Sequence, residues 1–78
     1  MISEVDHDSP VPLWRQVFEI VTARIEDGTY RRRLPSDRSL AQECGVSIGS
    51  VRHALDDLTG QGVIYTVKGK GRYIAERT

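Results

Sequence analysis

Positively charged side chains are concentrated in two segments, although the whole chain has eleven basic and eleven acidic residues and no formal net charge. Residues 28–55 contain five arginines against two acids, and residues 63–75 contain two lysines and one arginine without an acid. Residues 1–27, by contrast, contain six acids against two arginines. Arginine and lysine bind phosphate, and arginine also presents paired donors to guanine. The distribution therefore favours contact with a nucleic acid through two parts of the chain.

The other reactive side chains do not form a catalytic or metal-binding pattern. Cys44 is the single cysteine, so an internal disulfide is excluded. His7 and His53 have no nucleophile or metal ligand at a recognisable spacing. We therefore expect no enzymatic activity, no metal and no cofactor, and we expect Cys44 to be buried as a small apolar residue.

The length and composition are those of one small globular domain. Seventy-eight residues allow a single modest core, and 38% of them are hydrophobic while 28% are charged. No apolar run approaches the ~18 residues that a membrane span requires. The acidic, polar start lacks the basic and apolar parts of a secretory leader. We therefore expect a cytoplasmic protein, associated with the nucleoid, without a membrane partner.

Apolar periodicity predicts three helices, at about residues 12–27, 36–44 and 47–60. In the first, the apolar side chains fall within an arc of about 160° on a helical wheel, which is a broad core-facing stripe. Trp14 and Phe18 lie in this stripe and fit either the core or an interface between two copies. Arg24 lies there too, and we expect its stem to cover apolar surface while its head reaches solvent.

The ends of the chain are predicted to differ from its helical middle. Residues 1–9 are polar and unpatterned, which indicates a flexible N-terminal arm before a domain at 10–76. Toward the C-terminus, two β-prone runs, VIYTV and RYIA, flank the glycine-rich sequence KGKG. This pattern is typical of a β-hairpin, here at about residues 63–75.

Residues 37–56 satisfy the spacing of a helix-turn-helix. Ala41 is small where the first helix must let the second approach, and Gly45 follows four residues later in the turn. The remaining apolar contacts would come from Val46, Val51, Ala54 and Leu55. These positions alone also fit a helical hairpin in an ordinary three-helix bundle. The basic hairpin that follows favours a winged helix-turn-helix, a mainly α fold of three helices plus a two-stranded wing.

Short segments spread over residues 12–74 share a known pattern. They are PLWRQV at 12–17, LPSDRSLA at 34–41, GVS at 45–47, VRHALDDL at 51–58, GVIY at 62–65 and GKGRYI at 69–74. Together they resemble the DNA-binding domain of the GntR family of bacterial regulators. LPSDRSLA followed by GVS and VRHAL is the most specific part. The resemblance implies a helix-turn-helix that reads the major groove, with the wing alongside.

The resemblance implies DNA contacts by two arginines of the helix-turn-helix. Arg38 stands at the start of the second helix, and Arg52 matches a recognition-helix arginine that contacts base edges or phosphate. A guanidinium group holds guanine or phosphate with two hydrogen bonds. The alternatives are an ion pair of Arg38 with Asp37 or Glu43, and an ion pair of Arg52 with Asp56.

The start of the third helix departs from the family pattern, which commonly has arginine and threonine after the serine cap. Ile48 and Gly49 stand at these places. Ile48 fits either contact with a thymine methyl or packing under the turn, while Gly49 lets the backbone approach the groove. Ser50 is a candidate donor to phosphate, and His53 faces either the groove or solvent.

Two further basic clusters complete the candidate interface. The arginines at 31–33 fit either phosphate contact or a solvated surface, and the lysines of the hairpin turn fit either a DNA contact or a solvated tip. The full set of candidate DNA-binding residues is Arg31, Arg32, Arg33, Arg38, Ser47, Ile48, Gly49, Ser50, Arg52, His53, Lys68, Gly69, Lys70 and Arg72.

The sequence thus predicts a regulator of transcription that binds double-stranded DNA, with repression favoured over activation. A homodimer on an inverted-repeat operator is the expected assembly, and a winged-helix protein-interaction module is the alternative function. The family implies an effector-binding domain after the wing, which these 78 residues do not contain. The initial methionine favours a short stand-alone member over an excised domain.

Overall fold

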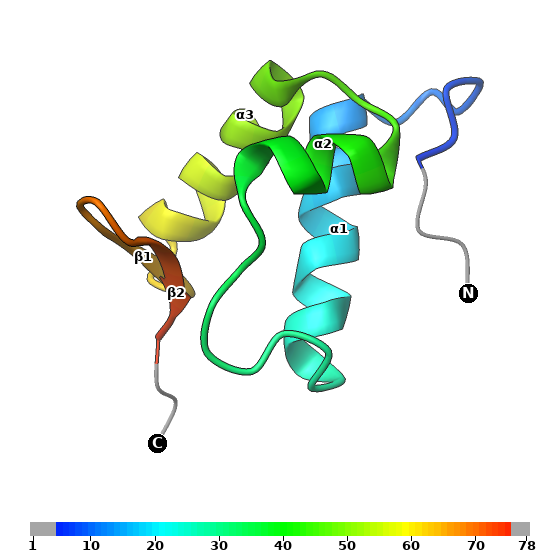
Figure 1. The fold of residues 1–78 in the computed structure, drawn as a ribbon. Helices are drawn as coiled ribbons and strands as arrows, with labels where there is room; N and C mark the ends of the chain where they lie inside the picture. The colour runs from blue at the N-terminus through cyan, green and yellow to red at the C-terminus, as the bar shows by residue number, and fades with distance from the viewer. Residues whose placement is uncertain (1–4, 76–78) are drawn as a thin grey trace.

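The computed structural model describes residues 5–75, which form three helices followed by a two-stranded antiparallel hairpin (Figure 1). The elements in chain order are α1 (Leu13–Glu26), α2 (Asp37–Cys44), α3 (Ile48–Gly60), β1 (Ile64–Val67) and β2 (Gly71–Ile74). Each helix end lies within one residue of the end predicted from the sequence. The predicted class, mainly α with a small hairpin, is confirmed.

Serine caps and one glycine fix the helix-turn-helix. The Ser36 hydroxyl accepts a hydrogen bond from the Ser39 N–H at 3.1 Å, and the Ser47 hydroxyl accepts one from the Ser50 N–H at 3.2 Å. Each bond satisfies a backbone donor that has no partner within the first turn of its helix. Gly45 ends α2 with φ 73°, a left-handed conformation that other residues rarely adopt. The turn before α3 is therefore specified by local residues.

The hairpin has a third extended segment along one edge, which the sequence did not predict. In the hairpin, Tyr65 pairs with Tyr73 across the strands. On the other side of β2, the Leu34 N–H donates to the Arg72 carbonyl at 3.0 Å, and the Ile74 N–H donates to the Arg32 carbonyl at 2.7 Å. The link between α1 and α2 therefore holds the wing against the helices.

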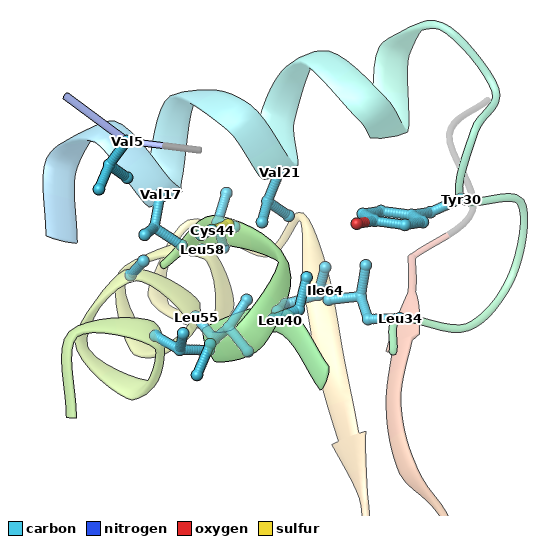
Figure 2. Close-up of a cluster of buried hydrophobic side chains, with 13 residues drawn as sticks. Val5, Val17, Val21, Tyr30, Leu34, Leu40, Cys44, Leu55, Leu58 and Ile64 are labelled. Carbon is cyan, nitrogen blue, oxygen red and sulfur yellow. The ribbon is translucent and has the colours of Figure 1, made fainter. Parts of the chain in front are cut away.

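A single apolar core joins the three helices and β1 (Figure 2), and the partly buried Ile74 of β2 packs against it. Its fully buried side chains come from every helix and from β1, and they include Val17, Val21, Leu40, Cys44, Val51, Leu55, Leu58 and Ile64. Burying each large aliphatic side chain contributes about 1.5–3 kcal/mol. The predicted burial of Cys44 is confirmed, because none of its surface is exposed. Burial also raises the pKa of this thiol above its ordinary value.

Arg24 differs from its prediction, because its head is buried. The residue is only 8% exposed, and its Nη1 donates to the Tyr30 hydroxyl at 2.5 Å and to Glu43 Oε1 at 3.2 Å. Its guanidinium carbon also lies 5.6 Å from the centre of the Tyr30 ring. A charged group is tolerated inside a protein where partners of this kind compensate for its lost hydration. The expectation that the head reaches solvent was wrong.

Residues 5–9 pack on the helices, so they do not form the free arm that the sequence predicted. Val5 is 8% exposed within the core, and its N–H donates to the Cys44 carbonyl at 3.0 Å. The Gln16 side chain accepts from the Asp6 N–H at 2.7 Å and donates to the Asp6 carbonyl at 2.9 Å. One apolar side chain and one glutamine therefore anchor a segment without periodicity. Residues 1–4 of the predicted arm lie outside the described residues.

Candidate nucleic-acid interface

Arg52, on α3, is the most exposed of the arginines that form ion pairs within residues 5–75. Its side chain is 65% exposed, and its Nε donates to Asp37 Oδ2 at 3.2 Å. The sequence offered Asp56 as an ion-pair partner, but the structure selects Asp37 from the first turn of α2. Arg52 thus combines an exposed head with a partner that holds its inner edge.

Asp37 also binds a cation from the wing. Its Oδ1 accepts a hydrogen bond from Arg72 Nη1, and both side chains are only 20% exposed. Arg72 was a candidate DNA contact, yet here its charge is compensated within the protein. One carboxylate therefore connects α2, α3 and β2, and it brings Arg52 of α3 next to Arg72 of the hairpin.

In the first turn of α3, Ile48 is turned toward the core, whereas Gly49 is exposed at the surface. Ile48 is partly buried and packs against the core, which agrees with packing under the turn. Gly49 is exposed, and a methyl group added there would meet only the Ser47 hydroxyl, at 3.8 Å. Ser47 and Ser50 hydroxyls lie 3.3 Å apart within the cap. The structure thus leaves Gly49 at the surface and engages Ser47 in capping.

Arg38 is exposed on α2 and forms neither of the ion pairs weighed from the sequence. Glu43 is bound to Arg24, and Asp37 is bound to Arg52 and Arg72. Within residues 5–75 no acidic group lies within 4.0 Å of the Arg38 head. Its charge is therefore available to a partner in solution.

The tip of the wing is basic and exposed. Lys68, Gly69 and Lys70 form the turn between β1 and β2, and the Lys70 N–H donates to the Val67 carbonyl at 2.9 Å. Gly69 has φ 78°, which a residue with a side chain rarely adopts. Neither lysine has an ion pair among residues 5–75. Figure 1 shows this turn projecting away from the body of the domain, beside α3.

The arginines at 31–33 are exposed, and the side chains of Arg32 and Arg33 lie beside the wing. The Arg33 guanidinium is 3.5 Å from the position that a Cβ would occupy at Gly71. Arg33 and Arg72 also line an open hollow of about 240 Å³ in front of Ser36 and Asp37. Arg32 instead lies near the stacked Tyr65 and Tyr73 rings on the hairpin. Arg32 and Arg33 therefore line different hollows beside the hairpin.

His53 is exposed as a residue, but its ring contacts α1. The imidazole stacks on the indole of Trp14 with a centroid distance of 4.1 Å and an interplanar angle of 13°. Phe18, further along the same helix, is partly buried against the core. Of the two large aromatic residues on α1, Phe18 therefore supports the core, while Trp14 supports the side of α3.

No group of three or more metal-ligating side chains is present among residues 5–75. Within the same residues, no helix is both long and apolar enough to cross a bilayer.

The arrangement of these elements defines a class of protein. Two helices joined by a short turn, with a third helix packed against the second and a hairpin beside it, form a winged helix-turn-helix. In this class the second helix of the pair is the recognition helix and the hairpin is the wing. Here α3 takes the first role, and β1 with β2 takes the second.

The chain belongs to the GntR family. The family model described as "Bacterial regulatory proteins, gntR family" matches residues 13–74. The transcriptional repressor NagR of Bacillus subtilis is 32% identical over 74 residues, which cover 92% of this chain and 30% of that protein. The histidine utilization repressor of Pseudomonas putida is 31% identical over 71 residues, which cover 88% of this chain and 29% of the repressor. The family is one of regulators rather than enzymes, as the sequence indicated.

Solved structures agree with this assignment. The DNA-binding domain of AraR, crystallised in complex with an operator, superposes with a TM-score of 0.83 at 32% identity, covering 96% of this chain and 99% of that domain. A GntR family transcriptional regulator from Listeria monocytogenes has the same TM-score and identity, covering 90% of this chain and 63% of its own. The chain thus matches a whole DNA-binding domain, whereas it spans under a third of NagR.

Asp37 is the residue that sequence reasoning missed. Its position in the LPSDR motif was visible, but only as a local partner for Arg38. The contacts to Arg52 and Arg72 span 15 and 35 residues of sequence. Spacing within one helix carries no signal for such pairs.

Proposed function

We propose that this chain binds double-stranded operator DNA and regulates transcription, with repression as the expected outcome. In this proposal α3 enters the major groove, and Lys68 and Lys70 of the wing hold the backbone or the minor groove. The observation that carries it is the shared contact of Arg52 and Arg72 with Asp37. This contact places Arg52 of α3 beside Arg72 of the wing, so cations from both DNA-binding elements lie next to each other although the chain has no net charge.

The roles of the candidate residues follow from their surroundings. Arg52 is suited to base edges, because a guanidinium fork binds guanine O6 and N7 with two hydrogen bonds. Arg38, the wing lysines and the exposed arginines of the 31–33 segment are suited to phosphates, which position the protein without reading sequence. Gly49 would let the backbone of α3 lie close to the bases. Such a role would place the protein on the nucleoid, in the cytoplasm.

The AraR domain supports the choice of ligand, because it was crystallised in complex with an operator. The repressor NagR and the histidine utilization repressor of Pseudomonas putida support the sign of regulation. We further propose a homodimer on an inverted repeat, since two-fold operators pair with two-fold proteins and place half-sites about one helical turn apart.

Selection from a random pool of duplexes tests this function directly. The chain is mixed with the pool, bound duplexes are recovered and sequenced, and affinity is then measured by fluorescence anisotropy. We expect enrichment of one motif repeated with inverted symmetry, and affinity at least about a thousandfold above that for a shuffled duplex. Absence of enrichment together with equal, weak binding to all duplexes would contradict the proposal and favour the protein-interaction module.

A further inference from the structure

Three elements that are distant in sequence meet at one carboxylate. Asp37 is in the first turn of α2, Arg52 is on α3 and Arg72 is on β2. Each oxygen of Asp37 serves a different arginine, since Oδ2 accepts from Arg52 and Oδ1 accepts from Arg72. The two contacts therefore do not compete, and both are made at the same time.

The contact fixes Arg52 without consuming the edge that reads DNA. The Nε of Arg52 donates to Asp37 at 3.2 Å. The two terminal nitrogens of the Arg52 guanidinium have no hydrogen-bond partner within residues 5–75. A bidentate contact to guanine requires two neighbouring N–H groups on one edge of the fork. The edge formed by the terminal nitrogens is free for this purpose, and the side chain is 65% exposed.

The environment of the carboxylate differs from that of a surface ion pair. Asp37 and Arg72 are each 20% exposed, so they are largely shielded from water, whereas Arg52 is not. A shielded anchor with an exposed head restricts the orientations of the head in the free protein. Restriction before binding lowers the conformational cost of binding, which is the general effect of preorganisation.

We propose that Asp37 is a specificity-determining positioning residue, which holds Arg52 in its base-reading orientation and couples the recognition helix to the wing through Arg72. This inference rests on the proposed DNA-binding function. Removing a negative charge near DNA should strengthen binding to every duplex by simple electrostatics. If Asp37 positions Arg52, the same change weakens binding to the selected site and leaves other duplexes bound as well as before, or better.

The experiment compares Asp37→Asn with the unchanged chain on two duplexes, the motif selected from the random pool and its shuffled form. The readout is the dissociation constant for the shuffled duplex divided by that for the selected duplex, both measured at one salt concentration. We expect the ratio to fall about tenfold, with the shuffled duplex bound at least as tightly as before. Glu26→Gln is the control for charge, because it also removes one negative charge, here an exposed one at the C-terminal end of α1, and its ratio should be unchanged.

The possible outcomes separate this inference from the function on which it rests. If the unchanged chain does not discriminate between the duplexes, the DNA-binding proposal itself fails. If the unchanged chain discriminates and Asp37→Asn discriminates equally, only the positioning role of Asp37 is overturned. A loss of affinity for both duplexes in the same proportion also overturns it, because that result indicates a purely structural role.

A second variant covers the case in which Asp37→Asn does not fold, as far-UV circular dichroism would reveal. Arg72→Gln removes the wing half of the contact and leaves the pair of Asp37 with Arg52 in place. We expect the ratio to fall by about threefold, because Asp37 loses one of its two anchors. An unchanged ratio in this variant overturns the coupling between wing and helix.

Discussion

The indole of Trp14 stacks on the imidazole of His53, with 4.1 Å between the ring centroids and 13° between the planes. This contact joins the first turn of α1 to the second turn of α3. The recognition helix is thereby supported from α1 by an aromatic pair and from α2 by the ion pair between Arg52 and Asp37. These two contacts fix the orientation of α3 relative to the rest of the domain.

Replacing His53 by alanine should therefore loosen α3 and change the environment of Trp14. A stacked aromatic pair contributes about 0.5–1.5 kcal/mol beyond its area of burial, so the free energy of unfolding should fall by that order. Trp14 is the single tryptophan, which makes its fluorescence a specific probe of this contact. His7→Ala is the control, because His7 bonds to the Gly45 carbonyl instead. Identical emission in the His53→Ala protein and the unchanged chain would contradict the stack.

Replacing Arg52 should separate affinity from discrimination. We expect Arg52→Ala to weaken binding to the selected duplex by about 1–3 kcal/mol, since it removes a bidentate base contact. Arg52→Lys keeps the charge but not the fork, so it should retain binding to the shuffled duplex while losing most of the discrimination. Fluorescence anisotropy with both duplexes measures the two effects. Full discrimination by the lysine variant would show that Arg52 acts only through its charge.

Replacing Lys68 should act on all sequences alike. Its exposed position at the wing tip suits a phosphate contact, and each such contact contributes about one unit to the slope of log affinity against log salt. Lys68→Ala should therefore flatten that slope by about one unit, while Lys68→Arg should preserve it. A slope that stays the same in the alanine variant would place the wing tip away from the DNA backbone.

The buried cluster around Arg24 should depend on the Tyr30 hydroxyl. In Tyr30→Phe the Arg24 Nη1 loses its 2.5 Å contact and keeps only Glu43, so we expect a loss of about 1–3 kcal/mol in the free energy of unfolding. Tyr65→Phe removes an exposed hydroxyl and should change stability by less than about 0.5 kcal/mol. Urea denaturation of both variants measures the difference. Equal stability of the two variants would show that the buried contact is unimportant.

Alkaline pH should destabilise the fold through two buried acids. Burial raises the pKa of Cys44 above its ordinary 9.0 and that of Tyr30 above 10.0, although the hydrogen bond from Arg24 opposes the shift at Tyr30. The folded state thus holds these protons more tightly than the unfolded state does. Their contribution is complete below the ordinary values and is lost as pH rises through the raised ones.

Urea unfolding of the chain between about pH 7 and pH 10 should therefore show a free energy that falls with rising pH. Cys44→Ala is the control. It is less stable because of the cavity it leaves, but its dependence on pH should be shallower, since one of the two shifted groups is gone. A stability curve that rises over this range, or that keeps its full slope in Cys44→Ala, would contradict the assignment to these groups.

Residues that act within a few positions of the chain determine most of the architecture, so the sequence alone was sufficient to predict it. Helix ends depend on caps and glycines that act within four residues, so Ser36, Gly45 and Ser47 were sufficient to place α2 and α3. The hairpin followed from two β-prone runs around a glycine-rich turn for the same reason. The distribution of charge along the chain also identified the two basic segments, residues 28–55 and 63–75, which contain every candidate DNA contact.

Tertiary structure decided which charges are free and which are paired. Arg24 and Arg72 are as basic in sequence as Arg38 and Lys68, yet the fold supplies partners to the first two and leaves the second two exposed. These pairings join residues up to 35 positions apart, and an ion pair depends on distance in space rather than on spacing in the chain. The sequence by itself determined where the cations are, while packing of α2 against α3 and the wing decided their roles.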